Sequence, residues 1–116
     1  MTDVIERITE AIFRQEGMSW KAVNPGNLRG APWLTDPLIH NGFWQPATRA
    51  EGVAGAAHVV ALRIAEGQSL AQLITGWAPP SDGNDTAQYI ANVKDWALIP
   101  DETVPLWEYL SPGEGA

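Results

Sequence analysis

The sequence has no cysteine among its 116 residues. This excludes a disulfide framework, a thiol nucleophile and any cysteine-ligated zinc or iron–sulfur site. Basic residues are also scarce, because seven Lys and Arg stand against fourteen Asp and Glu, for a formal net charge of −7. Such a balance argues against a partner that is bound through a phosphate backbone, so we expect no nucleic-acid partner.

Long hydrophobic runs and a targeting segment are missing as well. No stretch reaches about 18 consecutive apolar residues, so we expect no membrane insertion. Asp3 and Glu6 stand where a signal peptide would carry basic residues. We therefore expect a chain that is made in the cytoplasm and needs another route if it acts outside the cell.

Tyrosine and phenylalanine occur only twice each, whereas tryptophan occurs six times. An indole face suits both a core and the face of a sugar ring. Three tryptophans fall on apolar helix faces or near the C-terminal closure and are expected in the core: Trp77, Trp96 and Trp107. The other three lie in an irregular segment and could stack on a ligand: Trp20, Trp33 and Trp44. Trp44 is the best candidate because it borders a predicted hairpin turn.

Apolar spacing and capping residues predict a mainly α (α+β) domain with about five helices and one small β-hairpin. The helices are expected over 3–16, from 48 to about 66, from 69 to 77, and from 85 or 86 to 96, and a last short turn or helix is expected over about 101–110. Asn41-Gly42 is typical of a two-residue hairpin turn. The expected caps are Thr2, Thr48 with Glu51, Ser69, and Asp85 or Thr86. Residues 1–110 form one domain in this prediction, and 111–116 form a frayed tail.

Glu16 stands out at the end of the first predicted helix. It follows Ile5 by eleven residues, a rotation about 20° beyond three whole turns, so it continues the apolar stripe as a carboxylate. Partial burial and the helix dipole both disfavour its ionised form. A carboxylic acid that keeps its proton suits a glycosidase, which must protonate a leaving-group oxygen. The alternative is a half-exposed Glu at a frayed helix end.

A series of short motifs follows Glu16 in a set order. It consists of Asn24-Pro25-Gly26-Asn27-Leu28-Arg29, then Phe43, Glu51-Gly52, Trp77-Ala78-Pro79-Pro80, and finally Asn84 and Tyr89. The series resembles a lysozyme-like family of phage and prophage peptidoglycan-degrading proteins, which are distantly similar to lytic transglycosylases. The resemblance covers about residues 5–106.

This resemblance implies a lysozyme-like fold and cleavage of the MurNAc–GlcNAc bond of peptidoglycan, by a muramidase or a lytic transglycosylase, without a cofactor. Glu16 is then the catalytic general acid. The partner is the glycan strand of the bacterial cell wall, reached by a free phage-released enzyme or by one that is carried on the phage particle.

Six further residues are candidate substrate-binding residues: Asn24, Asn27, Arg29, Trp44, Asn84 and Tyr89. The Asn amides suit sugar hydroxyls and N-acetyl groups, although Asn and Pro can also simply stabilise a turn. Arg29 could hold a carboxylate of the substrate or of Glu16, or form a structural ion pair. Tyr89 lies where the family has a tyrosine near its catalytic Glu, but could be a core aromatic. Asn84 could instead close the turn before the next helix.

A second catalytic carboxylate is less evident. The candidates are Asp36, Glu51, Asp82 and Asp85. Glu51 and Asp85 have the positions of helix caps, whereas Asp36 lies where some lysozymes carry a second acid. A mechanism with one acid, in which the muramic acid 6-hydroxyl replaces water, stays open. His40 and His58 lack metal-ligand spacing, so no metal site is expected.

Two other functions fit the sequence. The acidic balance would slow approach to an anionic cell wall, which favours a non-catalytic virion or wall-binding protein with the same fold. A chitinase-like enzyme acting on another N-acetylglucosamine polymer is the second alternative.

Overall fold

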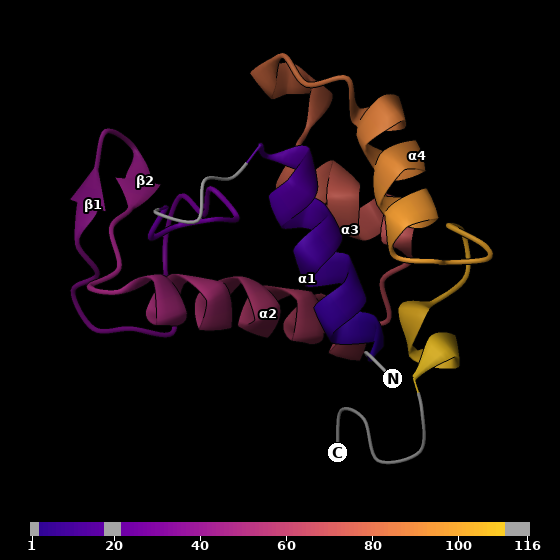
Figure 1. Cartoon of the computed structure of the whole chain (residues 1–116), viewed down its shortest axis with the longest axis horizontal. Helices are drawn as coiled ribbons and strands as arrows, with labels where there is room; N and C mark the ends of the chain where they lie inside the picture. The colour runs from indigo at the N-terminus through magenta and orange to yellow at the C-terminus, as the bar shows by residue number, and fades with distance from the viewer. Residues whose placement is uncertain (1–2, 18–21, 111–116) are drawn as a thin grey trace.

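The computed structural model describes residues 3–17 and 22–110 (Figure 1). In chain order its elements are α1 (Val4–Gln15), β1 (Ile39–His40), β2 (Phe43–Trp44), α2 (Arg49–Ala65), α3 (Leu70–Trp77), η1 (Pro80–Asp82), α4 (Thr86–Trp96) and η2 (Leu106–Tyr109). The predicted mainly α architecture with one small hairpin is confirmed. Within the described residues, four of the expected helices are α-helices, and the short turn or helix expected over about 101–110 is the 3-10 helix η2.

The start of α1 differs from the prediction by one residue. The N-cap is Asp3, whose carboxylate accepts a hydrogen bond from the Glu6 backbone N–H at 2.7 Å, and the expected cap, Thr2, lies outside the described residues. Asp3 can take this role because its backbone is extended and its side-chain oxygen reaches a free N–H of the first turn. At the other end Glu16 is the C-cap, and Gly17 follows with a left-handed φ of +70°.

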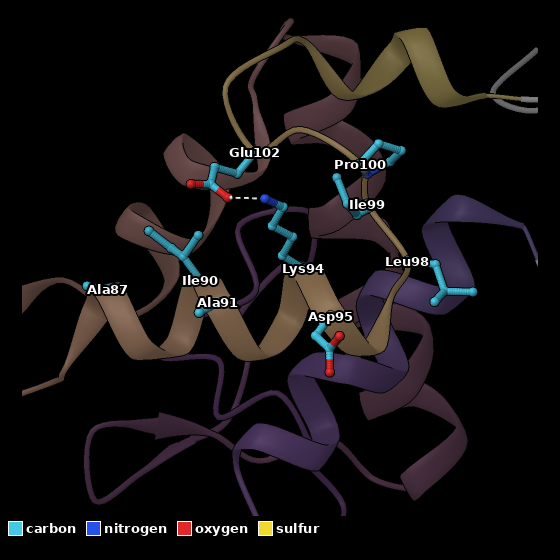
Figure 2. Close-up of a pocket in the computed structure, with 9 residues that line it drawn as sticks. All are labelled: Ala87, Ile90, Ala91, Lys94, Asp95, Leu98, Ile99, Pro100 and Glu102. Atoms are coloured by element: carbon cyan, nitrogen blue, oxygen red, sulfur yellow. Dashed lines mark ion pairs between the residues drawn. The ribbon is translucent and has the colours of Figure 1, made fainter.

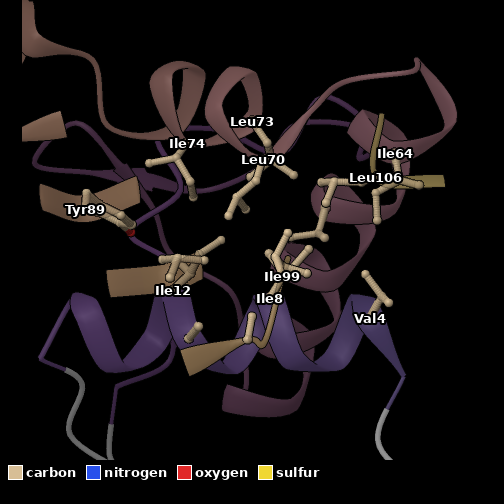
Figure 3. Packing of buried hydrophobic residues seen from close by; sticks show 14 of the residues in the cluster. Val4, Ile8, Ile12, Ile64, Leu70, Leu73, Ile74, Tyr89, Ile99 and Leu106 are labelled. Atoms are coloured by element: carbon tan, nitrogen blue, oxygen red, sulfur yellow. The ribbon is translucent and has the colours of Figure 1, made fainter. Parts of the chain in front are cut away.

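The core lies between α1, α2, α3 and α4. Figure 1 shows α1 crossing α2 at one end, with α3 behind it and α4 beside it. Three fully buried residues of α1 and three of α3 face one another across this space: Val4, Ile8, Ile12, Leu70, Leu73 and Ile74 (Figure 3). Ile99 and Leu106, from the C-terminal part of the chain, close the cluster. The stripe of apolar residues in the sequence therefore becomes the face that α1 buries.

Three of the expected caps are confirmed. Thr48 accepts from the Glu51 N–H, Asp85 accepts from the Gln88 N–H, and Ser69 forms a complete capping box with Gln72. Glu51 does not complete the expected capping box. Its carboxylate accepts a hydrogen bond from the backbone N–H of Ala47 at 3.2 Å, one residue before the N-cap Thr48.

Between α1 and α2 the chain forms an irregular segment, described over 22–47, that includes the hairpin. Ile39 pairs with Trp44 and His40 with Phe43, around a turn in which Asn41 and Gly42 have φ values of 52° and 81°. Both residues are left-handed, as a turn of the predicted type requires. In Figure 1 the hairpin stands over the N-terminal end of α2, away from the chain termini.

The tryptophans divide differently from the prediction. Trp44, the best candidate for stacking, is only 4% exposed, because its ring packs over Gly55 and edge-on to Trp33. Trp107, expected in the core, is 52% exposed. Trp77 and Trp96 do pack against the core, as expected. Trp20 lies outside the described residues.

Of the described helices, none has the length and apolar character to cross a membrane.

Candidate active site around Glu16

Glu16 lies where α1 ends, and its carboxylate is held by two donors from distant parts of the chain. Oε1 accepts a hydrogen bond from Asn27 Nδ2 at 2.6 Å. Oε2 accepts one from the Tyr89 hydroxyl at 2.8 Å, across a sequence separation of 73 residues. Three residues singled out from the sequence therefore meet at one carboxylate. These two hydrogen bonds hold the end of α1 at Glu16, so the alternative of a frayed helix end does not fit.

Tyr89 reaches Glu16 from α4. Tyr89 belongs to the core and is 4% exposed (Figure 3). Its hydroxyl donates to the Glu16 carboxylate. Burial, reinforced by the hydrogen bond to Glu16 and by the charge of that carboxylate, raises the pKa of Tyr89 well above its ordinary value. The phenol therefore keeps its proton and acts on Glu16 as a donor. Beside it, Asn92 donates to the Gln15 side chain at 2.8 Å and ties α4 to α1 a second time.

Asn27 reaches Glu16 from the loop 24–28. Its φ of 52° is left-handed, a conformation that Asn adopts more easily than most residues. The loop is fixed on both sides of it. Trp77 Nε1 donates to the Gly26 carbonyl at 2.9 Å, and the Trp44 N–H donates to the Leu28 carbonyl at 2.9 Å. Asn27 is therefore presented to Glu16 on an ordered loop.

Asn24 uses its amide inside the protein. Nδ2 donates to the carbonyls of Leu28 and Trp44 at 2.8 and 2.9 Å, and Oδ1 accepts from the Leu28 N–H at 3.0 Å. Both amide protons are thus committed to the backbone. These contacts favour a positioning role for Asn24 over direct contact with a substrate.

The other expected binding residues lie apart from the carboxylate. The Arg29 guanidinium lies 4.8 Å from the centre of the Phe43 ring, and within the described chain it makes no ion pair with Glu16. Asn84 donates to the Pro79 carbonyl at 3.1 Å, which fits the turn-closing alternative. The burial of Trp44, which is 4% exposed, does not fit stacking of its ring on a sugar.

A hollow of about 360 Å³ begins at Asn27 and runs between the loop, α2 and the end of α3. The polar and aromatic side chains that line it include Asn27, Arg29, Trp33, Arg63, Gln68 and Asp82. Asn27 thus borders both Glu16 and the hollow. Arg63 of α2 and Gln68, between α2 and α3, belong to no sequence motif, and only the packing of these elements beside the loop brings them here.

The four candidate second carboxylates occupy different places. Glu51 binds the Ala47 N–H and Asp85 caps α4, so both serve helix ends. Asp36 is exposed, with a left-handed φ of 49°. Asp82 alone of these four lines the hollow that Asn27 borders. Over the described residues no group of three His, Asp or Glu side chains could hold a metal ion.

A larger hollow, about 560 Å³, lies between α4 and the segment 98–102 (Figure 2). Lys94 and Glu102 form an ion pair across it at 3.0 Å, and Leu98 stands at its edge with 72% exposure. Glu16, Asn27 and Tyr89 do not line this hollow, so it is distinct from the candidate active site.

No protein-family model matches the chain, and no curated protein or solved structure gives a significant match.

Proposed function

We propose that the protein has a lysozyme-like fold and is a peptidoglycan-degrading glycosidase, a muramidase or lytic transglycosylase that cleaves the MurNAc–GlcNAc bond with Glu16 as general acid. The observation that carries the proposal is the convergence of Asn27 and Tyr89 on the Glu16 carboxylate. The order of the sequence motifs also singles out Glu16, Asn27 and Tyr89 as candidate site residues. The hollow beside Asn27 offers an adjacent surface for a glycan strand.

The contacts suggest how Glu16 would move a proton. Because Tyr89 stays protonated and donates to Oε2, the transferable proton of a neutral Glu16 is held at Oε1. The Asn27 amide can turn to accept from that Oε1 hydroxyl, since its carbonyl and NH2 groups exchange places by rotation. When the proton passes to the glycosidic oxygen, the bond to the leaving sugar breaks. The new carboxylate then accepts from both Asn27 and Tyr89.

The second half of the reaction uses Glu16 as a base. The carboxylate takes a proton from the group that attacks the oxocarbenium-like sugar. If water attacks, the product has a new reducing end, and Asp82 in the hollow is then the candidate for a second carboxylate. If the 6-hydroxyl of the same muramic acid attacks, the product is a 1,6-anhydro sugar and no second acid is needed.

Glu16→Gln tests the proposal, because it keeps the size of the side chain and removes the transferable proton. We expect clearing of purified peptidoglycan to fall by about 1,000-fold, in the range that general acid catalysis contributes. The melting temperature should stay near that of the wild type. Glu10→Gln, an exposed position on the same helix, is the matched control and should clear at the wild-type rate.

Full clearing by Glu16→Gln would show that another residue is the acid. A wild-type protein that sediments with peptidoglycan without cutting it would point to the non-catalytic wall-binding alternative.

A further inference from the structure

The outer face of α2 has the composition of a buried helix. Residues 52–62 are eleven consecutive positions without Asp, Glu, Lys or Arg. A helix that is apolar on all sides is ordinarily covered on all sides. One side of α2 does enter the core, through Val60 and Ile64. The opposite side is a stripe of exposed residues at steps of three and four positions: Ala54, His58, Leu62 and Ala65.

Two hollows lie along this stripe and meet at His58. The first, of about 450 Å³, is walled by Trp33, Leu34 and Trp44 from the irregular segment. The second, of about 380 Å³, is walled by Ile5, Trp107 and Leu110. His58 lines both, and its ring lies edge-on to Trp33 with 4.9 Å between ring centres. We call the stripe and the two hollows together the α2 groove.

The α2 groove has the length and spacing that suit another helix. Figure 1 shows α2 along one side of the molecule, with the hairpin over one end and α1 crossing the other. From Glu51 to Ala65 the groove extends about 20 Å, or about four helical turns. Residues at three- and four-residue steps form the ridges through which helices pack on one another. The geometry therefore fits an amphipathic helix laid along α2.

Three large apolar side chains beside the groove are half exposed. They are Leu34, Leu62 and Trp107, at 45, 42 and 52% exposure. Single exposed apolar residues are ordinary on a protein surface, but these three line one continuous depression. An apolar patch of this kind marks an interaction site.

The charges around the groove select a basic partner. Of the described residues that line the two hollows, none is Lys or Arg, whereas Glu51 lines the first. Glu66 caps α2 at the other end, and exposed Glu108 follows Trp107. Arg63, which pairs with Glu66, lines the separate hollow beside Asn27. A second copy of this chain would bring the same acids and another −7 of charge, which disfavours self-association.

We propose that the α2 groove binds a basic amphipathic helix of a partner protein. Its apolar face lies along Ala54, His58 and Leu62, and its Lys and Arg side chains lie near the acids at the two ends of α2. Glu16 and Tyr89 line neither hollow, so this surface is separate from the candidate active site. The partner-binding role therefore goes beyond the proposed cleavage of peptidoglycan.

The experiment measures the binding of three labelled synthetic peptides to the full chain by fluorescence anisotropy. Each peptide is long enough for about four helical turns. The basic peptide has Leu at three- and four-residue steps and Lys elsewhere. The acidic peptide has Glu in place of each Lys. The scrambled peptide has the composition of the basic one without an apolar stripe.

Two matched pairs of variants locate the binding surface. Ala54→Arg places a long side chain in the groove, and Ala91→Arg adds the same charge at an exposed position of α4, in the hollow of Figure 2. Leu62→Gln removes an exposed leucine from the groove, and Leu98→Gln removes one outside it. Circular dichroism melting verifies that each variant is folded.

We expect the wild type to bind the basic peptide at least about tenfold more tightly than the acidic or the scrambled one, because only the basic peptide matches both the charge and the apolar stripe. Ala54→Arg should weaken this binding by at least about tenfold relative to Ala91→Arg, as obstruction of a central contact predicts. Leu62→Gln should bind more weakly than Leu98→Gln.

Equal binding of the basic and scrambled peptides would show attraction to net charge alone and would overturn the inference. Equal binding by Ala54→Arg and Ala91→Arg would place the peptide elsewhere, with the same consequence. A wild-type dimer in analytical ultracentrifugation that only Ala54→Arg dissociates would assign the groove to a second copy instead. Loss of peptidoglycan clearing bears on the proposed function alone, because the peptide assay needs no cleavage.

Discussion

The helical body formed by α1, α3 and α4 and the irregular segment 22–47 are held together by different forces. The body buries a continuous apolar cluster that includes Ile8, Ile12 and Leu73. The irregular segment has few buried apolar side chains apart from Trp44, and it depends on side-chain bonds to the backbone, such as those of Asn24. Glu16 lies between the two, with Tyr89 of the body on one oxygen and Asn27 of the segment on the other.

This difference shows how one carboxylate can be fixed without a dedicated cluster of charged residues. Tyr89 is placed by burial, because its ring cannot move without disturbing the core. Asn27 is placed by hydrogen bonds, because Gly26 and Leu28 on either side of it are tied down. Changes in the body should therefore act through packing, and changes in the segment should act through polar contacts and close backbone approach.

The largest effect is expected where the segment meets α2. A Cβ added at Gly52 would lie 1.6 Å from the Val23 carbonyl oxygen, so the backbone must move apart. We expect Gly52→Ala to lower the free energy of unfolding by about 3 kcal/mol, at the upper end of overpacking costs. Urea denaturation followed by circular dichroism measures it.

Gly76→Ala, in α3, is the matched control. A Cβ at this position meets nothing within 4 Å, so the substitution should raise stability by about 0.5 kcal/mol through helix propensity. Equal free energies of unfolding for the two glycine variants would contradict the close contact between Val23 of the irregular segment and Gly52 of α2.

A smaller loss is expected at Asn24. Asn24→Ala removes the hydrogen bonds to the backbone of Leu28 and Trp44 and leaves their carbonyls without this donor, which should cost about 2 kcal/mol. Peptidoglycan clearing should fall too, because the loop that carries Asn27 loosens. Asn84→Ala, which removes one exposed bond to Pro79, should change stability by no more than about 0.5 kcal/mol. A neutral Asn24→Ala would contradict the positioning role.

The smallest effect concerns Tyr89 and appears only in alkali. Below a pH of about 10 the phenol is protonated in both the folded and the unfolded chain, so pH has no effect through it. Above that pH the unfolded phenol ionises while the raised pKa keeps the folded one neutral. Stability should then fall by about 1.4 kcal/mol per pH unit. Tyr89→Phe has no phenol at this position, so its free energy of unfolding should fall less steeply above a pH of about 10. If the free energy of unfolding depended on alkaline pH in the same way in both proteins, the buried phenol would be contradicted.

Local signals in the sequence were sufficient for much of the fold. The stripe containing Ile8 and Ile12 predicted α1, and Asn41-Gly42 predicted the hairpin turn. Such features depend on neighbours a few residues away. The cap of α1 was misplaced by one residue because Thr2 and Asp3 are both good caps, and the choice depends on the local backbone.

The site was predicted in part. Glu16 stood out from its place at the end of the apolar stripe, whereas Tyr89 came only from the resemblance, because no local pattern could have joined residues 73 positions apart. Trp44 was misjudged because its burial depends on the gap at Gly55, where a Cβ would lie 2.6 Å from the ring. Arg63 was missed because an arginine on a helix carries no signal until the neighbouring loop is in place.

Mass spectrometry of peptidoglycan digested by the wild type and by Glu16→Gln tests the central claim most directly. The account predicts soluble muropeptides from the wild type, ending in either a reducing MurNAc or a 1,6-anhydro MurNAc, and almost none from Glu16→Gln. The same products in the same yield from both proteins, or cleavage only of peptide bonds, would contradict the role of Glu16 as the general acid of a glycosidase.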